Sequence, residues 1–295
     1  MNTKTAMITI AGRPNVGKST LTNRLVGEKI AIVSNKPQTT RNRICGILTK
    51  EQTQFVFVDT PGFHKAKTKL GDYMVNTVRE SIADVDATVL VVEPIASVGT
   101  QEQLLLEQLA SKKCPVLLAI NKIDTVEKEA LLEVMAVYSS AYQFDAIIPI
   151  SAKTGDGLKV LLQECEKYAQ EGPMLFPEDI TTDQPERQVM AEIIREKLLW
   201  CLEREIPHGT AVEITKFSER DNGIIDLDAT IYCEKNSHKG IIIGKNGEML
   251  KKISTMARTD CEKFMGTKVF LTTWVKVKES WRDSDFLIRN FGYRE

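Results

Sequence analysis

Long apolar runs are absent from this sequence: no stretch approaches the roughly 18 consecutive apolar residues that a membrane-spanning helix needs. A signal-peptide pattern is absent as well, so we expect a cytoplasmic protein. No cysteine stands in a C-x-x-C motif, which is typical of reduced thiols and argues against disulfides or a zinc site. The six cysteines are Cys45, Cys114, Cys165, Cys201, Cys233 and Cys261.

Net charge is nearly absent too, with 39 basic against 40 acidic residues. The charge of the whole chain therefore indicates no partner, and a signal for nucleic acid has to come from local segregation of charge. The 295 residues predict about two domains, and a hydrophobic content of 42% suffices for buried cores.

The strongest motif is GRPNVGKS at residues 12–19, which matches the phosphate-binding pattern G-x-x-x-x-G-K-[ST] at every fixed position. A strand-like run precedes it and a helical pattern follows, so the loop is expected to open a helix whose start favours an anion. A Gly-rich turn that matches by chance is the alternative. We expect Lys18 to reach the β- and γ-phosphates and Ser19 to bind Mg²⁺. The predicted contacts are Gly12, Arg13, Pro14, Asn15, Val16, Gly17, Lys18, Ser19 and Thr20.

Strands and helices alternate through the first 170 residues or so, which predicts an α/β P-loop domain with a mostly parallel sheet and helices on both faces. Sheets of this kind bind ligands at the carboxyl ends of their strands. Strands are expected at 55–58, 87–92, 116–120 and 146–150, and helices at 101–109, 126–142 and 158–168.

Three short motifs follow these strands. After the first, Asp59 is expected to contact Mg²⁺ through water and the Gly62 N–H to lie near the γ-phosphate. Asp124 can accept the N1–H and the N2 amine of guanine, whereas adenine would leave its carboxylate unpaired at a cost of about 1–3 kcal/mol. The motif at 151–153 is expected to offer a backbone N–H to the guanine O6. The predicted contacts are Asp59, Thr60, Pro61, Gly62, Asn121, Lys122, Asp124, Ser151, Ala152 and Lys153.

The polar segment 35–41 is the expected first switch, and Thr40 is its predicted Mg²⁺ ligand in the GTP state. A solvated loop is the alternative. Residues 62–71 are the expected second switch. Phe63 stands where small GTPases place a water-orienting Gln, and it cannot hydrogen-bond a water, so we expect slow intrinsic hydrolysis. The ring of Pro14 would obstruct an incoming arginine finger, so the missing charge needs another source.

Residues 172–185 collect Gly, Pro and acidic residues without periodicity and predict a linker between domains at 1–171 and 186–295. The second domain follows the order helix–strand–strand–helix–strand with a last helix, which predicts an α+β type II KH fold.

A G-x-x-G loop, Gly244-Lys245-Asn246-Gly247, follows an apolar run in this second domain. Alone it is a weak signal that a plain turn would also give. Residues 235–278, however, hold ten basic against three acidic residues, and such a charge excess favours single-stranded RNA, with no DNA partner expected. The predicted RNA contacts are Lys239, Ile243, Gly244, Lys245, Asn246, Gly247, Lys251 and Lys252.

These two domains in this order resemble the Era family of bacterial GTPases over essentially the whole chain, and the segments 205–214, 271–281 and 292–293 resemble Era hallmarks. The resemblance implies a GTPase that binds GTP or GDP with Mg²⁺ and assembles the small (30S) ribosomal subunit. Its KH domain would hold the 3′ end of 16S rRNA. The resemblance also implies peripheral association with the cell membrane, and we expect a monomer.

In GTPases that this chain resembles, an Asn at the position of Asn15 helps to bind a K⁺ ion, with Thr39 close by. This ion would supply the missing charge. The predicted catalytic set is Asn15, Lys18, Thr39, Thr40 and Gly62. A loop-bracing role for Asn15 is one alternative, and His64 as a general base is another.

Two functions stay open at this point. The first is a GTP-hydrolysing switch that acts on ribosomal RNA. The second is an RNA-binding scaffold that is gated by nucleotide but has negligible turnover, for which Phe63 is the best argument.

The substitution Asp124→Asn tests the predicted choice of base. Its amide presents a donor to the 2-oxo group of xanthine, so nucleotide preference should shift from GTP toward XTP. Competition binding with the two nucleotides measures the shift, and unchanged GTP affinity would exclude Asp124 as the base-reading residue.

Overall fold

The computed structural model describes residues 3–63, 66, 68–83, 85–112 and 114–293. Contacts divide it into two compact units. The first comprises Met1–Ala31, Thr40–Ala66 and Asp72–Asp183, and the second comprises Ile32–Thr39, Lys67–Gly71 and Gln184–Glu295. In the part of the chain so described, no helix has the length and apolar character to cross a membrane. All six cysteines are free thiols.

The first unit is built on a sheet with the strand order β2-β3-β1-β4-β5-β6, in which β2 is antiparallel to β3 and the other pairs on this path are parallel. Its strands are β1 (Lys4–Ala11), β2 (Ile44–Lys50), β3 (Thr53–Asp59), β4 (Ala87–Val92), β5 (Val116–Ile120), β6 (Ala146–Pro149) and β7 (Gln170–Glu171), the last pairing antiparallel with β1. Its helices are α1 (Lys18–Val26), α2 (Lys69–Ser81), α3 (Thr100–Lys112), α4 (Lys128–Ala141) and α5 (Leu158–Glu166), with a 3-10 turn, η1 (Ile123–Thr125).

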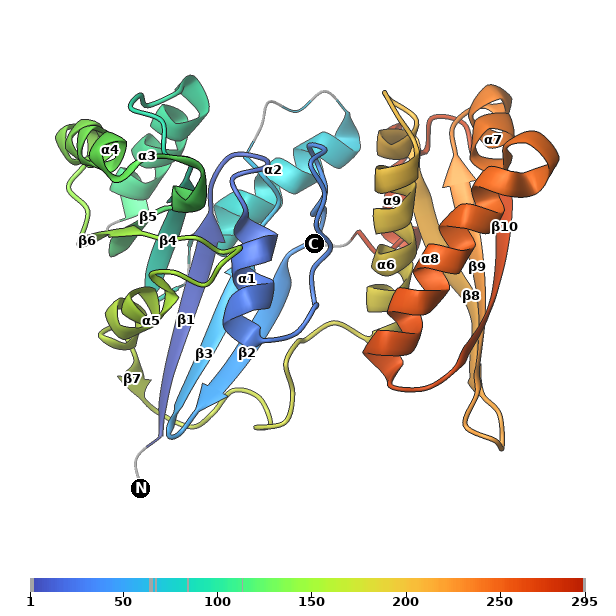
Figure 1. Ribbon diagram of the computed structural model, residues 1–295, viewed down its shortest axis with the longest axis horizontal. Coiled ribbons are helices and arrows are strands. Elements are labelled where there is room, and N and C mark those ends of the chain that lie inside the picture. The colour runs from blue at the N-terminus through green and yellow to red at the C-terminus, as the bar shows by residue number, and fades with distance from the viewer. Residues whose placement is uncertain (1–2, 64–65, 67, 84, 113, 294–295) are drawn as a thin grey trace. The chain divides into compact units, whose positions relative to one another are not determined.

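Helices cover both faces of this sheet. Along β4, Val89 and Val91 pack with side chains of α1 and α5, whereas Leu90 and Val92 pack with side chains of α2, α3 and α4. A strand buried on both faces is typical of a parallel α/β sheet. The predicted α/β architecture is therefore confirmed, and Figure 1 shows α1 lying against its strands.

The sequence pattern gave no bounds for β2, the antiparallel edge strand, for the short strand β7, or for α2, which begins within the expected second switch. The expected linker, which lies wholly within the described residues, holds no helix or strand, but hydrogen bonds tie its later residues to β2. The Ile47 N–H donates to the Thr181 carbonyl at 2.8 Å, and the Cys45 N–H donates to Asp183 Oδ1 at 3.0 Å. Residues up to Asp183 thus line β2 and belong to the first unit.

The second unit is a three-stranded sheet in the order β10-β9-β8, with β10 parallel and β8 antiparallel to β9. Its elements are α6 (Glu186–Cys201), η2 (Pro207–Gly209), β8 (Ala211–Glu219), β9 (Ile225–Cys233), α7 (Asn236–Ile243), η3 (Lys245–Gly247), α8 (Glu248–Met265), β10 (Val269–Val277), η4 (Trp281–Asp283) and α9 (Asp285–Asn290). The predicted order was wrong in one respect. The apolar run before the G-x-x-G loop lies in a helix, α7, so the observed order is α-β-β-α-α-β-α, with α9 as the expected last helix.

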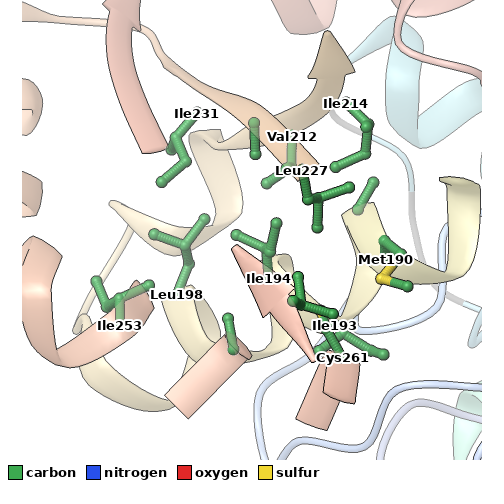
Figure 2. Close-up of a cluster of buried hydrophobic side chains, with 14 of the residues drawn as sticks. Met190, Ile193, Ile194, Leu198, Val212, Ile214, Leu227, Ile231, Ile253 and Cys261 are labelled. Carbon is green, nitrogen blue, oxygen red and sulfur yellow. The ribbon is translucent and has the colours of Figure 1, made fainter. Parts of the chain in front are cut away.

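The core of the second unit lies between the sheet and two helices. Ile194 and Leu198 of α6 meet Ile231 of β9 and Ile253 of α8, all of them buried, as Figure 2 shows. Figure 1 shows α6 and α8 running side by side across the strands. Because α8 begins directly after Gly247, this packing fixes the position of the G-x-x-G loop.

Candidate functional site

The phosphate-loop motif connects β1 to α1, as the sequence predicts. Gly12 has φ +151°, and a Cβ there would lie 2.4 Å from the Val91 carbonyl oxygen. Gly17 has φ +101°, and its Cβ would lie 2.3 Å from Asn121 Nδ2. Only glycine fits either place. The N–H groups of the first turn of α1, from Lys18 to Thr20, lack partners within the helix and can serve an anion.

Lys18 and Asp59 are both buried below this loop. The Lys18 ammonium donates to the carbonyls of Gly12 and Arg13 at 3.0 and 2.9 Å. Burial lowers the pKa of Lys18 to about 8, an effect that the charge of Asp59 opposes. Burial raises the pKa of Asp59 to about 6, opposed by its hydrogen bond to Ser19 and by the charge of Lys18. Two charged groups that are costly to bury are typical of a functional site.

The hydroxyls of Ser19 and Thr40 lie beside Asp59 of this pair. Ser19 Oγ donates to Asp59 Oδ2 at 2.7 Å and lies 2.8 Å from Thr40 Oγ1. Asp59 Oδ1 is buried and has no hydrogen-bond partner among the described residues. A hydroxyl pair with a carboxylate suits a hard divalent cation, so the residues present fit Mg²⁺.

Asn121 and Lys122, after β5, brace the phosphate loop. Asn121 Nδ2 donates to the Val16 carbonyl, and Lys122 Nζ donates to the Asn15 carbonyl, both at 2.8 Å. The motif after β5 thereby fixes the backbone of the motif after β1. Thr60, after β3, ties in the same way to the backbone of β1 by donating to the Ile10 carbonyl at 2.9 Å.

Asp124 and the motif after β6 form the expected base-binding pair. Ser151 Oγ donates to Asp124 Oδ1 at 2.7 Å, which orients the carboxylate. The Ala152 N–H donates to Asn121 Oδ1 at 2.9 Å. A base carbonyl at this place would compete with Asn121 for that N–H, which the sequence pattern did not indicate. The Lys153 side chain is largely exposed and lies 3.9 Å from Asp124.

The expected catalytic residues are only partly brought together. A Cβ on Gly62 would lie 2.8 Å from Pro14, so Gly62 and the Pro61–Gly62 turn pack against the phosphate loop. Phe63 is buried in the core with side chains of α2 and β4. Thr39 Oγ1 donates to the Lys36 carbonyl at 2.7 Å, and Thr39 groups with the second unit. His64 lies outside the described residues.

The sequence pattern missed Glu93 and Glu102. Glu93 pairs with both Arg13 of the phosphate loop and Lys122 of the base motif, and Glu102 Oε1 lies 2.7 Å from Arg13 Nε. One carboxylate thus bridges two loops that are far apart in the sequence. Glu93 directly follows β4, so its place at a carboxyl strand end was the signal that pointed to it.

The G-x-x-G loop turns sharply between α7 and α8. Gly244 has φ +73°, and a Cβ there would lie 2.7 Å from the Met249 Cβ. Asn246 and Gly247 also have positive φ, 51° and 78°. Lys239 and Ile243 lie on α7, Lys245 and Asn246 are exposed in the loop, and Lys251 and Lys252 are exposed in the first turns of α8. The predicted RNA contacts therefore share one end of the second unit.

Family models match both units. A model described as "50S ribosome-binding GTPase" matches residues 7–122, and a model described as "KH domain" matches residues 205–282. The chain is 52% identical over 294 residues to the GTPase Era of Ruminiclostridium cellulolyticum, covering 100% of this chain and 99% of that one. It is 52% identical over 291 residues to the GTPase Era of Clostridium kluyveri, covering 99% of each.

Two solved structures resemble the full chain. One is a variant of Aquifex aeolicus Era bound to GDP·AlF4⁻, and the other is Era in complex with MgGDPNP and nucleotides 1506–1542 of 16S ribosomal RNA. Each has a TM-score of 0.95 at 35% identity and covers 99% of this chain and 100% of its own.

The substitution Glu93→Gln tests whether the bridge between Arg13 and Lys122 supports nucleotide binding. Loss of one partly exposed charged bridge is worth about 1 kcal/mol, so GDP should dissociate about fivefold faster. Stopped-flow release of a fluorescent GDP measures the rate. Glu107→Gln, at an exposed position of α3, is the matched control, and equal rates in both variants would rule out the bridge.

Proposed function

The chain belongs to the Era family of GTPases, and on that premise we propose that it is an assembly factor for the 30S ribosomal subunit that binds the 3′ end of 16S rRNA. The observation that carries this proposal is the union, in one chain, of a buried phosphate-loop site and an exposed basic G-x-x-G loop. It is supported by the full-length likeness to an Era structure that contains MgGDPNP and 16S rRNA.

The phosphates of GTP would lie on the start of α1, with Lys18 turning from the loop carbonyls toward the β- and γ-phosphates. Ser19 and Thr40 would hold Mg²⁺ directly and Asp59 through water. Mg²⁺, when bound, neutralises charge on the phosphate oxygens. Both Lys18 and Asp59 would gain partners of opposite charge, which offsets the cost of their burial.

The base would lie between Asp124 and the motif at Ser151–Lys153. Ser151 already holds the Asp124 carboxylate at 2.7 Å, so this acceptor is preorganised for the two donors of guanine. Competition of a base carbonyl with Asn121 for the Ala152 N–H is compatible with this role, because one N–H can be shared between two acceptors.

Hydrolysis adds water to the γ-phosphate of GTP and yields GDP and phosphate. Phe63 is buried among core side chains and cannot orient that water, so the intrinsic rate is expected to be slow. We assign the missing charge to a K⁺ ion held in part by Asn15, whose amide oxygen is a suitable donor for an alkali cation. The Gly62 N–H would stabilise the γ-phosphate from the other side.

RNA would bind at the G-x-x-G loop. Gly244 lets a phosphate chain approach the backbone closely, and the start of α8 favours anions there. Lys245, Lys251 and Lys252 add positive charge to the same end of the unit. Nucleotide state would govern binding and release of the RNA. The change in RNA affinity would equal the difference between GTP and GDP in how much each stabilises the RNA-binding conformation.

The proposal includes the setting in which the protein acts. The family resemblance supports a monomer in the cytoplasm that associates peripherally with the cell membrane.

A second function is favoured by one observation, the burial of Phe63 at 7% exposure. With no residue there to orient water, the chain would act as an RNA-binding scaffold that requires bound nucleotide and turns it over negligibly. The polar cluster of Ser19, Thr40 and Asp59 favours the hydrolysing switch over this alternative.

The double substitution Lys245→Asp/Asn246→Asp tests the RNA site. Aspartate tolerates the positive φ of Asn246, so the loop should keep its shape while its charge beside the phosphates is reversed. Affinity for a single-stranded RNA with the 16S 3′-end sequence should fall by about tenfold or more, in both nucleotide forms. Fluorescence anisotropy measures it, with Lys159→Asp on α5 as control. Equal loss in the control, or none in the loop variant, would exclude this surface.

The substitution Asn15→Gly tests the K⁺ site. Glycine keeps the φ of +66° that Asn15 adopts, so only the amide is lost. Wild-type GTP hydrolysis should be faster in KCl than in NaCl at equal ionic strength, and the variant should lose the difference. Phosphate release in the two salts measures this. Equal wild-type rates in both salts would contradict a role for K⁺.

A further inference from the structure

Residues Ile32–Thr39 pack with the second unit, although chain order places them between α1 and β2 of the first. Their partner is α6. The Val33 N–H donates to Glu196 Oε1 at 2.9 Å, and Trp200 Nε1 donates to the Val33 carbonyl at 2.9 Å. The Arg195 guanidinium donates to the Thr39 carbonyl. Backbone groups at both ends of this segment are therefore held by side chains of a single helix.

The charges on α6 are buried to an unusual degree. Arg195, Glu196 and Lys197 are consecutive, and none is more than 1% exposed. At 3.6 residues per turn, three consecutive residues span about 200° of the helix, so one neighbouring element cannot cover them all. Lys197 faces α8, where it pairs with Asp260 at 2.5 Å. Arg195 pairs with Glu192 on its own helix and also donates to the Thr39 carbonyl. Glu196 pairs with Lys197 and also accepts from the Val33 N–H.

The end of α6 is held by the same segment. Lys36 Nζ donates to the carbonyls of Leu199 and Leu202, in the last turn and at the C-cap of α6. An ammonium at the C-terminal end of a helix donates to carbonyls that lack partners within the helix, and its positive charge interacts favourably with the negative end of the helix dipole. Residues 32–39 therefore bind both the side chains of α6 and the carbonyls at its C-terminal end.

The contacts between residues 32–39 and α6 connect to both predicted sites, the Mg²⁺ cluster and the G-x-x-G loop. Thr39 is followed directly by Thr40, whose hydroxyl lies 2.8 Å from Ser19 Oγ. On the other side, Lys197 bridges Glu196 at 2.7 Å to Asp260 of α8, the helix that begins at the G-x-x-G loop. The Thr39–Thr40 peptide bond therefore joins the predicted Mg²⁺ ligand to the segment that α6 holds. The pairing of α6 with α8 in turn connects that segment to the helix that begins at the predicted RNA loop.

We propose that α6 acts as a clasp for residues 32–39, and that this clasp transmits nucleotide state to the RNA-binding loop. The inference rests on the proposed function, because it needs Thr40 to respond to the γ-phosphate and the G-x-x-G loop to bind RNA. When Thr40 is held by Mg²⁺ and the γ-phosphate, residues 32–39 keep their hydrogen bonds to α6. When Thr40 is released, Arg195 and Glu196 keep their ion pairs on α6 but each loses a hydrogen bond to the backbone of residues 32–39, and α6 reorganises against α8.

The double substitution Lys36→Met/Trp200→Phe opens the clasp without emptying the core. It removes the ammonium at the end of α6 and the Nε1–H that holds Val33, and both replacements keep most of the side-chain volume. Lys50→Met, at the exposed end of β2, is the matched control. The full-length chain is used throughout, with the 16S 3′-end RNA as the probe and GDP or a non-hydrolysable GTP analogue bound.

The measured quantity is the ratio of RNA affinities in the two nucleotide forms. Wild type and the control should show a ratio within the range of about 5- to 150-fold that is usual for coupled sites, and the double variant should show a ratio within about twofold of one. Hydrogen exchange at the Val33 amide should be slow in wild type and at least tenfold faster in the double variant.

Each other outcome overturns a specific statement. A double variant that keeps the wild-type ratio, or that loses RNA binding equally in both forms, contradicts the clasp and leaves the proposed function intact. A wild-type ratio of one contradicts the clasp and the nucleotide gating of RNA together. Wild type that binds no RNA in either form contradicts the proposed function itself, which the clasp requires.

Discussion

The burial of Lys18 beside Asp59 is the constraint on which the rest of the first unit depends. A buried ammonium and a buried carboxylate lose several kcal/mol of hydration free energy each, so the fold has to surround them with polar partners. The carbonyls of Gly12 and Arg13 and the Ser19 hydroxyl provide these partners. Asn121 and Lys122 donate to the carbonyls of Val16 and Asn15 and so fix the backbone of the loop that surrounds Lys18.

The same constraint extends beyond the loop through Thr40. Its hydroxyl joins the Ser19–Asp59 cluster, while the residues before it belong to the second unit. A site whose buried charges are only partly neutralised is stabilised by a ligand that brings the missing opposite charges. Because Thr40 is covalently continuous with a segment held by α6, part of this binding free energy can alter the conformation of the second unit.

The sequence predicted those parts of the structure in which one residue type is the only physical solution. Gly12, Gly17 and Gly244 stand where a Cβ would collide with backbone or side-chain atoms, and such positions form recognisable motifs. The sheet and its strand-end motifs followed from the alternation of strands and helices. The domain bounds read from the sequence, 1–171 and 186–295, and the roles of the individual site residues stay predictions.

Residues whose partners are distant in the sequence could not be predicted. The position of Glu93 directly after β4 could be read from the sequence, but its pairing with Arg13, like that of Arg195 with Thr39, becomes visible only in the fold. Helix α7 was missed because its apolar residues are consecutive, which is as typical of a buried strand as of a helix. A backbone N–H of the motif at 151–153 was assigned to the base from the motif alone, and only the structure reveals Asn121 as the acceptor of the Ala152 N–H.

Multiple-turnover phosphate release by the full-length chain, with and without an RNA that carries the 16S 3′ end, tests most directly whether this buried site drives a hydrolysing switch. With Mg²⁺ and excess GTP, we expect slow release of many phosphates per chain, a higher rate with RNA, and none above background in Lys18→Ala. Release that stops at or below one phosphate per chain, with RNA present, would contradict the switch and leave the nucleotide-gated scaffold.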